Sequence, residues 1–303
     1  WINTIEVSTH DAGTAYVAIN NYRNDDFANY LYKTTDFGKN WTSIVGDLPA
    51  NRVVRTMRED PRNPNVLYLG TELGLFVSID GGDHWVELKN NMPTLAFNDL
   101  VVHPRDNDLV LGTHGRGVWI LDNLNAIQEM TPQIMNQQAH LFSIPTSEMI
   151  NYDREGAHTG DMVFRGENPP DGAIIDYYLK NPTSQADIAL AIYTQNGELV
   201  KKLKPDTTAG IRRVIWDFHH ENLAGMPRNP YDTTSNNRRE RPGPDGPLAL
   251  PGLYVAKLTV NGQDYEQIFM IEDDPRVEIE IEDRADWTAT VFEIADLYET
   301  ILA

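Results

Sequence analysis

Short runs in which apolar and polar residues alternate recur along the first part of the chain, and turn residues separate them. They form three groups: 4–8, 15–19 and the strand around Leu31; 53–57, 66–71 and 75–77; and 98–103, 109–114 and 118–122. Alternation with a period of two predicts half-buried β-strands. Each group has the size of one propeller blade, so residues 1–122 predict three blades.

The same turn follows the third predicted strand of the first two groups. Its pattern is Ser/Thr-x-Asp-x-Gly-x-x-Trp, formed by Thr34, Asp36, Gly38 and Trp41 and again by Ser78, Asp80, Gly82 and Trp85. Asp and Ser/Thr side chains accept hydrogen bonds from the backbone of their own turn, and Gly adopts conformations that other residues resist. The pattern therefore predicts a structural turn, with no acid, base or nucleophile poised on a substrate.

This turn resembles the Asp-box, or bacterial neuraminidase repeat, of sialidases, xyloglucanases and sortilin-type β-propellers. The resemblance implies that the two turns lie on the outside of a propeller, away from an active site. Nearly the whole chain is similar to bacterial exported proteins of the sortilin-like or glycosyl hydrolase-repeat type. A periplasmic or secreted location in a bacterium is what this likeness implies.

Beyond the blades the sequence predicts a connector, 123–138, and then a β-sandwich, 139–272. Asn-Gly pairs at 196–197 and 261–262 predict tight hairpins in the sandwich. Segments 210–217 and 251–262 resemble immunoglobulin-like or fibronectin type III-like modules. The expected fold class is all-β: the C-terminal blades of a β-propeller, a β-sandwich and a short C-terminal helix.

The tail, 273–303, changes character. Val277, Ile279 and Ile281 alternate with glutamates and predict an acidic edge strand, after which a helical period begins near Asp286, with Asp283 or Asp286 as its N-cap. The helix carries an apolar stripe, for which we expect either docking on its own chain or a protein partner. The stripe consists of Trp287, Val291, Ile294, Leu297 or Tyr298, and Ile301.

Three blades do not close a propeller, which normally needs about four to eight. We therefore expect further blades upstream of Trp1 or, as the alternative, a partner chain that closes the ring. Without them, the faces that pack on neighbouring blades would remain open as apolar patches.

The composition of the chain limits the classes of molecule that can be its partners. The formal net charge of −20 argues against a nucleic acid partner, because the phosphates would be repelled. The chain has no cysteine, which excludes disulfides and thiolate metal sites, and no apolar run long enough for a transmembrane segment. Asp217, His219 and Glu221 alternate and could hold a metal, but we favour an exposed strand face, so no metal or cofactor is predicted.

Candidate binding residues lie in the turns between the second and third strands of each blade, which share one face of a propeller. They are Arg23, Asp25, Asp26, Glu72, His114 and Arg116. Asp25 and Asp26 invite a glycosidase interpretation, in which two carboxylates flank the scissile bond. The alternative is a loop packed by hydrogen bonds of its own aspartates, and we favour it because adjacent carboxylates in a loop have no fixed separation.

Our leading hypothesis for function is a non-catalytic exported scaffold or binding protein that contacts proteins or glycans. A secreted glycoside hydrolase, with catalytic residues partly in missing N-terminal blades, is the first alternative. A peripheral subunit of an envelope complex is the second. Whether the protein is an enzyme stays open at this point, with the expectation leaning against catalysis.

Overall fold

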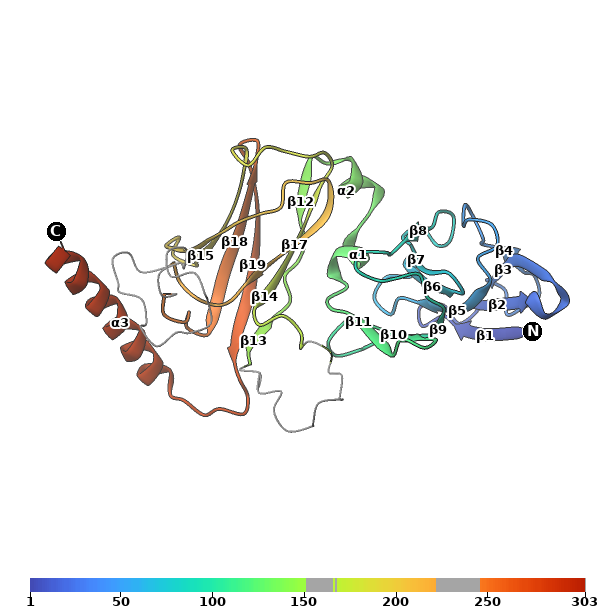
Figure 1. The fold of residues 1–303 in the computed structure, drawn as a ribbon, viewed down its shortest axis with the longest axis horizontal. Helices are drawn as coiled ribbons and strands as arrows, with labels where there is room; N and C mark the ends of the chain where they lie inside the picture. Colours follow the sequence, from blue (N-terminus) through green and yellow to red (C-terminus); the bar gives the residue numbers. More distant parts are fainter. Residues whose placement is uncertain (151–165, 167, 222–245, 303) are drawn as a thin grey trace. The chain divides into compact units, whose positions relative to one another are not determined.

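The computed structural model describes all residues except 151–165, 167, 222–245 and 303. The chain divides into unit 1, Trp1–Pro132, and unit 2, Gln133–Ala303. Both units consist mainly of antiparallel strands (Figure 1). The predicted fold class is confirmed: blade-like sheets, a second β-region and one C-terminal helix.

Unit 1 contains three sheets in which sequential strands pair as neighbours. Blade 1 consists of β1 (Ile2–Val7), β2 (Ala15–Asn21), β3 (Asp26–Thr34) and β4 (Thr42–Ser43). Blade 2 consists of β5 (Val54–Glu59), β6 (Leu67–Thr71), β7 (Gly74–Ser78) and β8 (Val86–Glu87). Blade 3 consists of β9 (Phe97–Val102), β10 (Leu109–Thr113) and β11 (Val118–Leu121). The first strand of each blade is called its inner strand below.

Each blade has two faces because successive side chains of a strand point to opposite sides. The front face is defined by cross-strand triples, which are Ile5–Val17–Tyr32 in blade 1, Met57–Leu69–Phe76 in blade 2 and Leu100–Leu111–Trp119 in blade 3. The back face carries the residues in between, such as Tyr16, Ala18 and Leu31 in blade 1.

The blades pack front to back. The back face of blade 1 shares one apolar cluster with the front face of blade 2, and the back face of blade 2 shares a second cluster with the front face of blade 3. Strand β6 takes part in both clusters, since Leu67 and Leu69 lie in the first while Tyr68 lies in the second. Every residue of β6 is consequently buried, although its neighbours come from different blades.

Unit 2 forms two sheets. One is β12 (Ala139–Leu141), β14 (Ala173–Leu179) and β17 (Gly210–Trp216). The other has the order β13 (Ser147–Met149), β19 (Gln263–Asp273), β18 (Gly252–Val260), β15 (Ile188–Thr194) and β16 (Leu199–Leu203). One buried cluster joins both sheets, and at its centre the ring of Trp216 meets Tyr254 and Phe269 edge to face.

Both predicted Asn-Gly hairpins form, between β15 and β16 and between β18 and β19. In the second, Asn261 and Gly262 have φ of 50° and 81°, the left-handed conformation that a type I′ turn requires. Strand β17 ends at Trp216, earlier than predicted, because Phe218 adopts φ of 62° and turns the chain. The alternation of Asp217, His219 and Glu221 is therefore not an extended strand face.

The predicted acidic strand at 277–282 is wrong. Residues 277–280 have no regular structure, and α3 (Ile281–Leu302) begins within the predicted strand. A period of two creates a strand only where a neighbouring backbone offers hydrogen bonds. The predicted N-caps, Asp283 and Asp286, lie inside the helix. Glu282 and Asp283 lie in its first turn, where their negative charges interact favourably with the helix dipole.

Helix α3 exposes much of its predicted apolar stripe. Trp287, Ile294 and Leu297 are exposed, while Thr288 and Ala295 are buried, and the ring of Phe292 meets His220 at 5.1 Å. A protein partner for this helix stays a prediction. Within the described residues, no helix has the length and hydropathy needed to cross a membrane. Two short helices, α1 (Asn125–Glu129) and α2 (Pro132–Asn136), occupy the predicted connector.

Candidate functional site

The six predicted binding residues lie in or beside the turns between the second and third strands of the blades. The turn in blade 1 is short, because a 3-10 turn, η1 (Tyr22–Asn24), leads directly into β3 at Asp26. Glu72 lies between β6 and β7, and His114 and Arg116 lie exposed between β10 and β11. Among the described residues, no hydrogen bond or ion pair links His114 or Arg116 to Glu72 or Arg23.

Asp25 and Asp26 are in different settings. Asp25 closes η1 with a φ of 60° and is exposed. The carboxylate of Asp26 accepts hydrogen bonds from the Asn21 side chain at 2.9 Å, the Tyr30 hydroxyl at 2.6 Å and the Ala28 N–H at 3.1 Å. These bonds, led by that from Asn21, lower the pKa of Asp26. Asp26 is thus a charged group that holds its own loop together, and is poorly suited to donate a proton.

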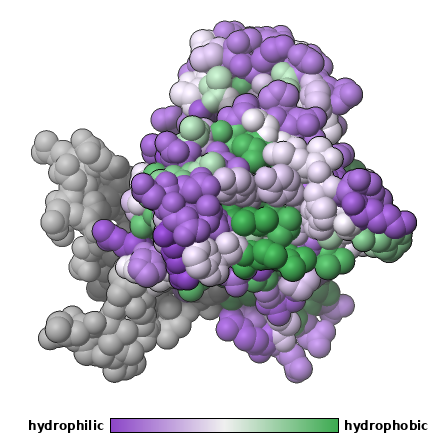
Figure 2. All heavy atoms as spheres, turned by 90° about the vertical axis from the view of Figure 1, so that its right-hand side faces the viewer, coloured by the Kyte–Doolittle hydropathy of each residue, from purple (hydrophilic) through white to green (hydrophobic). Residues whose placement is uncertain are grey.

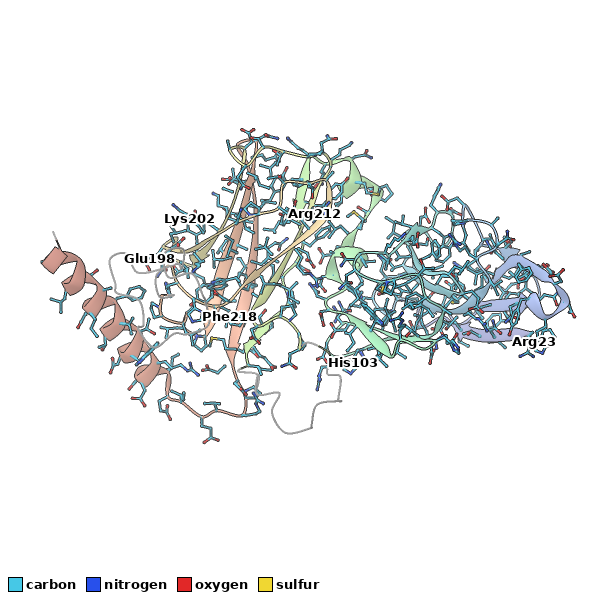
Figure 3. The ribbon with its side chains drawn as sticks, viewed as in Figure 1. Arg23, His103, Glu198, Lys202, Arg212 and Phe218 are labelled. Carbon is cyan, nitrogen blue, oxygen red and sulfur yellow. The ribbon has the colours of Figure 1, made fainter. Side chains whose placement is uncertain are left out.

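A cation–aromatic cluster joins the turns of blades 1 and 2. Arg55, at the start of β5, forms an ion pair with Glu72, and its guanidinium lies 5.1 Å from the ring centre of Tyr22. Arg23 lies 5.8 Å from the same ring and 4.8 Å from the ring of Trp1, at the N-terminal end of unit 1 (Figure 3). The hydrogen bond from Arg23 lowers the pKa of Tyr22.

Of this cluster, Arg23 and Glu72 were predicted, whereas Trp1, Tyr22 and Arg55 were missed. Nothing in the sequence signals them, because Arg55 belongs to an inner strand and meets Tyr22 only after the blades pack. We call these five residues the rim cluster.

A second set of charged residues crosses the inner strands of all three blades. Arg58 on β5 donates to Asp99 on β9 at 2.7 Å, and its other terminal nitrogen lies 3.6 Å from the carboxylate of Glu6 on β1. We call these three residues the inner-strand row. It was missed as well, since each strand contributes one charged residue. The sequence feature that could have indicated these residues is a charged residue between apolar residues of one strand, such as Glu6 between Ile5 and Val7.

The two carboxyl groups of the inner-strand row differ in their surroundings. Burial raises the pKa of Glu6 above its ordinary value, although the positive charge of Arg58 and a backbone hydrogen bond act in the opposite direction. Asp99, in contrast, has a side chain that is 65% exposed. A partly buried carboxyl group with a raised pKa and a more exposed carboxyl group therefore flank one guanidinium, which is an arrangement suited to acid–base chemistry.

The two Asp-box turns form matching hydrogen bonds. In the first, Thr34 donates its hydroxyl to Asp36 at 2.8 Å, and the N–H of Asn40 donates to the same carboxylate at 2.9 Å. In the second, Ser78 and the N–H of His84 make the same contacts to Asp80 at 2.8 and 2.9 Å. Each aspartate is occupied by its own turn, as in a structural element.

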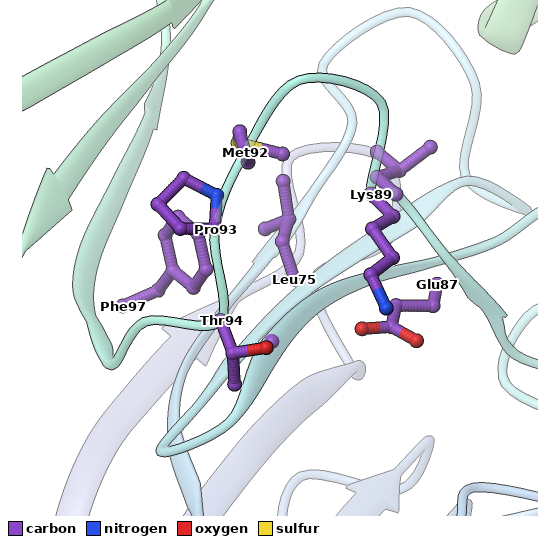
Figure 4. A pocket seen from close by; sticks show the side chains of 9 residues that line it. Leu75, Glu87, Lys89, Met92, Pro93, Thr94 and Phe97 are labelled. Carbon is purple, nitrogen blue, oxygen red and sulfur yellow. The ribbon is translucent and has the colours of Figure 1, made fainter.

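A small pocket between β7, β8 and the following loop is lined by residues that include Leu75, Glu87, Met92 and Phe97 (Figure 4). Its cavity volume of about 10 Å³ holds about one water molecule. No group of three His, Cys, Asp or Glu side chains among the described residues could hold a metal ion.

Neither the family models nor the sequences of curated proteins match this chain. Among solved structures it is similar to the GH74 enzyme of Niastella koreensis, with 11% identity, a TM-score of 0.34, and coverage of 88% of this chain and 46% of that one. It is also similar to the GH74 xyloglucanase of Xanthomonas campestris (13%, 0.32, 88% and 38%) and to an ancestral GH74 enzyme (11%, 0.33, 88% and 31%). The chain thus spans less than half the length of each.

These neighbours correct our leading hypothesis for function. All three are glycoside hydrolases, which contradicts the expected non-catalytic scaffold or binding protein and agrees with the glycoside hydrolase alternative.

Proposed function

We propose that unit 1 is part of an exported bacterial glycoside hydrolase with a propeller fold, and that the inner-strand row takes part in its chemistry. The observation that carries this proposal is the placement of Glu6 and Asp99 on either side of Arg58, on the inner strands of three successive blades. The blades of a propeller surround a central channel, and ligand sites are concave, so we place the proposed site on the inner strands that face this channel.

The proposed reaction uses the two carboxyl groups in different roles. Glu6 donates its proton to the leaving glycosidic oxygen as the bond from that oxygen to the anomeric carbon breaks. Asp99 takes a proton from a water molecule, whose oxygen forms the new bond to the anomeric carbon. Arg58 holds both side chains and positions Asp99 through its 2.7 Å hydrogen bond.

The rim cluster is proposed to hold the glycan. Arg55 precedes Arg58 on β5 by three residues, so the Cα atoms of the two arginines lie ~10 Å apart along the strand. Aromatic rings such as Tyr22 and Trp1 offer flat apolar faces, and the Arg55–Glu72 pair offers donors and acceptors for hydroxyl groups. A sugar chain that runs along β5 would meet the rim cluster first and the inner-strand row next.

The test is hydrolysis of xyloglucan and other β-glucans by the protein isolated from its source, measured as the appearance of reducing ends. Glu6→Gln and Asp99→Asn are each expected to lower turnover by about 10²–10⁴-fold. Glu87→Gln, which changes an exposed carboxylate on the outer strand β8, is the matched control and should leave turnover unchanged.

Two results would count against this assignment. Wild-type turnover in Glu6→Gln and Asp99→Asn would remove the inner-strand row from the chemistry. Loss of turnover in Asp25→Asn or Asp26→Asn, with the row variants unaffected, would move the reaction to the blade 1 turn.

A further inference from the structure

The front face of blade 1 is apolar and open. Its triple Ile5–Val17–Tyr32 continues into Ile2 and Ile19, which pair with each other, and into Val7. Ile5 is 64% exposed, and Ile2 and Val7 are exposed to a similar extent. Figure 2 looks onto this end of unit 1 and shows the apolar side chains gathered in one patch with polar residues around it.

The equivalent faces of the other blades are closed. The triple Met57–Leu69–Phe76 of blade 2 is at most 1% exposed because the back face of blade 1 covers it. The front face of blade 3 is covered in the same way by the back face of blade 2. In both described interfaces, a front face thus takes the back face of the blade that precedes it. The front face of blade 1 has the same arrangement of apolar residues, but among the described residues no back face of another blade packs on it.

The two Asp-box tryptophans give an independent indication. Trp85 of blade 2 is 6% exposed, and its indole N–H donates at 3.1 Å to the carbonyl of Ile44, just after the fourth strand of blade 1. Its backbone N–H donates at 2.7 Å to Asp47 in the same segment. Trp41 of blade 1 is 44% exposed, and its indole N–H donates to Gly38 of its own turn.

The glycines of the two turns agree with this difference. A Cβ atom on Gly82 would lie 2.9 Å from Ile44, so the second turn is pressed against the segment after β4. At Gly38, the equivalent position in the first turn, the nearest contact would be 3.8 Å away and comes from Trp41 itself. The first turn thus has the same motif as the second, but among the described residues no segment of another blade packs against it.

We infer that the front face of blade 1, together with Trp41, binds the back face of a further Asp-box propeller blade that is not among residues 1–303. This blade presents an aromatic residue at the position of Tyr16 and Tyr68, and the segment after its fourth strand offers a backbone carbonyl to the indole of Trp41. The inference rests on the blade interfaces and is independent of the proposed catalytic chemistry.

Blade 3 of a second copy does not fit this description. Its back face has Val110 where blades 1 and 2 have Tyr16 and Tyr68. Its sheet has three strands and is followed by α1, so it offers no segment equivalent to Ile44–Asp47 for Trp41.

The test places the photo-cross-linker p-benzoylphenylalanine at Ile5 in the protein isolated from its source, and the cross-linked peptides are sequenced by mass spectrometry. The expected peptide lies outside residues 1–303 and contains an apolar strand followed by Ser/Thr-x-Asp-x-Gly-x-x-Trp. The same cross-linker at Val86, an exposed position of the outer strand β8, is the control and should not produce this peptide. A cross-link to residues 109–121 of a second copy, to a peptide without the pattern, or to nothing would overturn the inference.

Hydroxyl-radical oxidation of Trp41 supplies a second measurement that needs no substitution. Trp41 should be protected at least about fivefold in the protein from its source relative to the isolated chain 1–303, while Trp85 is protected in both. Equal oxidation of Trp41 in the two samples would overturn the inference.

Discussion

The hydroxyl of Tyr16 donates a 2.8 Å hydrogen bond to Oε1 of Glu59 across the interface between blades 1 and 2. Both residues are buried, and the other carboxylate oxygen of Glu59 accepts from Ser8 at 2.6 Å. Tyr16→Phe leaves Oε1 of a buried carboxylate without this donor, so we expect the free energy of unfolding to fall by about 1–3 kcal/mol. Urea unfolding of the chain measures it.

Tyr32→Phe is the control for this substitution. Tyr32 lies on the open front face of blade 1 and is only partly buried, so its change should stay within about 0.5 kcal/mol. Equal effects of the two substitutions would mean that the Tyr16–Glu59 bond does not contribute to the interface.

The second Asp-box turn should depend on pH differently from the first. In the second, His84 donates to Asp80, which raises the pKa of His84; in the first, Asn40 occupies the equivalent position. Burial alone would raise the pKa of Asp80, but the hydrogen bonds from His84 and Ser78 lower it overall. The stabilisation that charged His84 contributes is present below the pKa that His84 has in the unfolded chain, and it is lost as the pH rises through the pKa of His84 in the folded chain. The stabilisation that Asp80 contributes is lost as the pH falls through the pKa of Asp80 in the folded chain.

His84→Asn gives the second turn the chemistry of the first. The difference in melting temperature between wild type and His84→Asn should therefore shrink as the pH rises from about 5 to about 8. Thermal melts across this range check it. A difference that is constant with pH would show that the charge on His84 contributes nothing.

Two tryptophans of the same motif should differ in their contribution to stability. Trp85→Ala removes a buried side chain between blades 1 and 2 and is expected to cost about 3–5 kcal/mol. Trp41→Ala removes an exposed side chain and should cost less than about 1 kcal/mol in the isolated chain. Denaturant unfolding of both variants compares them directly, and similar losses would contradict the exposure of Trp41.

A buried ion pair in unit 2 offers a fourth test. Arg213 donates from two nitrogens, each at 2.8 Å, to the two oxygens of Asp176, whose side chain is 1% exposed. Arg213→Met leaves a buried carboxylate without this partner, so we expect a loss of about 3–5 kcal/mol.

The surface offers a matched pair for comparison. Arg105 makes the same two-nitrogen contact to Asp106, but its side chain is 82% exposed. Arg105→Met should cost less than about 1 kcal/mol. Arg105 lies in unit 1 and Arg213 in unit 2, so denaturant unfolding is followed by circular dichroism, which observes the strands of both units. Equal losses in the two variants would show that burial of Asp176 does not matter.

Local chemistry explains which parts of the fold were predictable. The blade strands and Asn-Gly hairpins depend on alternation and on turn residues such as Asn261 and Gly262, both visible within a few positions. The parallel pairing of β13 with β19 was not predictable, because three residues, Ser147–Met149, carry no strand signal without their partner. The strand predicted in the tail does not form for the same reason, because the alternating segment at Val277 and Ile279 has no neighbouring strand to pair with.

The candidate site was harder to predict than the fold. Adjacent charges in a turn, such as Asp25 and Asp26, are conspicuous in a sequence but are occupied or exposed in the structure. Glu6, Arg58 and Asp99 lie on three strands far apart in the chain, and only the packing of the blades brings them together. The periodic pattern of the sequence predicts the blades, whereas the alignment of each blade on the next determines which side chains are in contact.

The Asp-box hydrogen bonds also have a consequence for the order of folding. They join residues two and four positions apart, as in Thr34 to Asp36 and Asn40 to Asp36, whereas the Tyr16–Glu59 bond joins residues 43 positions apart. Short-range contacts close small loops at low entropic cost, so each hairpin can nucleate before its blade finds a neighbour. The repeat thus separates the folding of a blade from its assembly, and a chain of blades can grow one hairpin at a time.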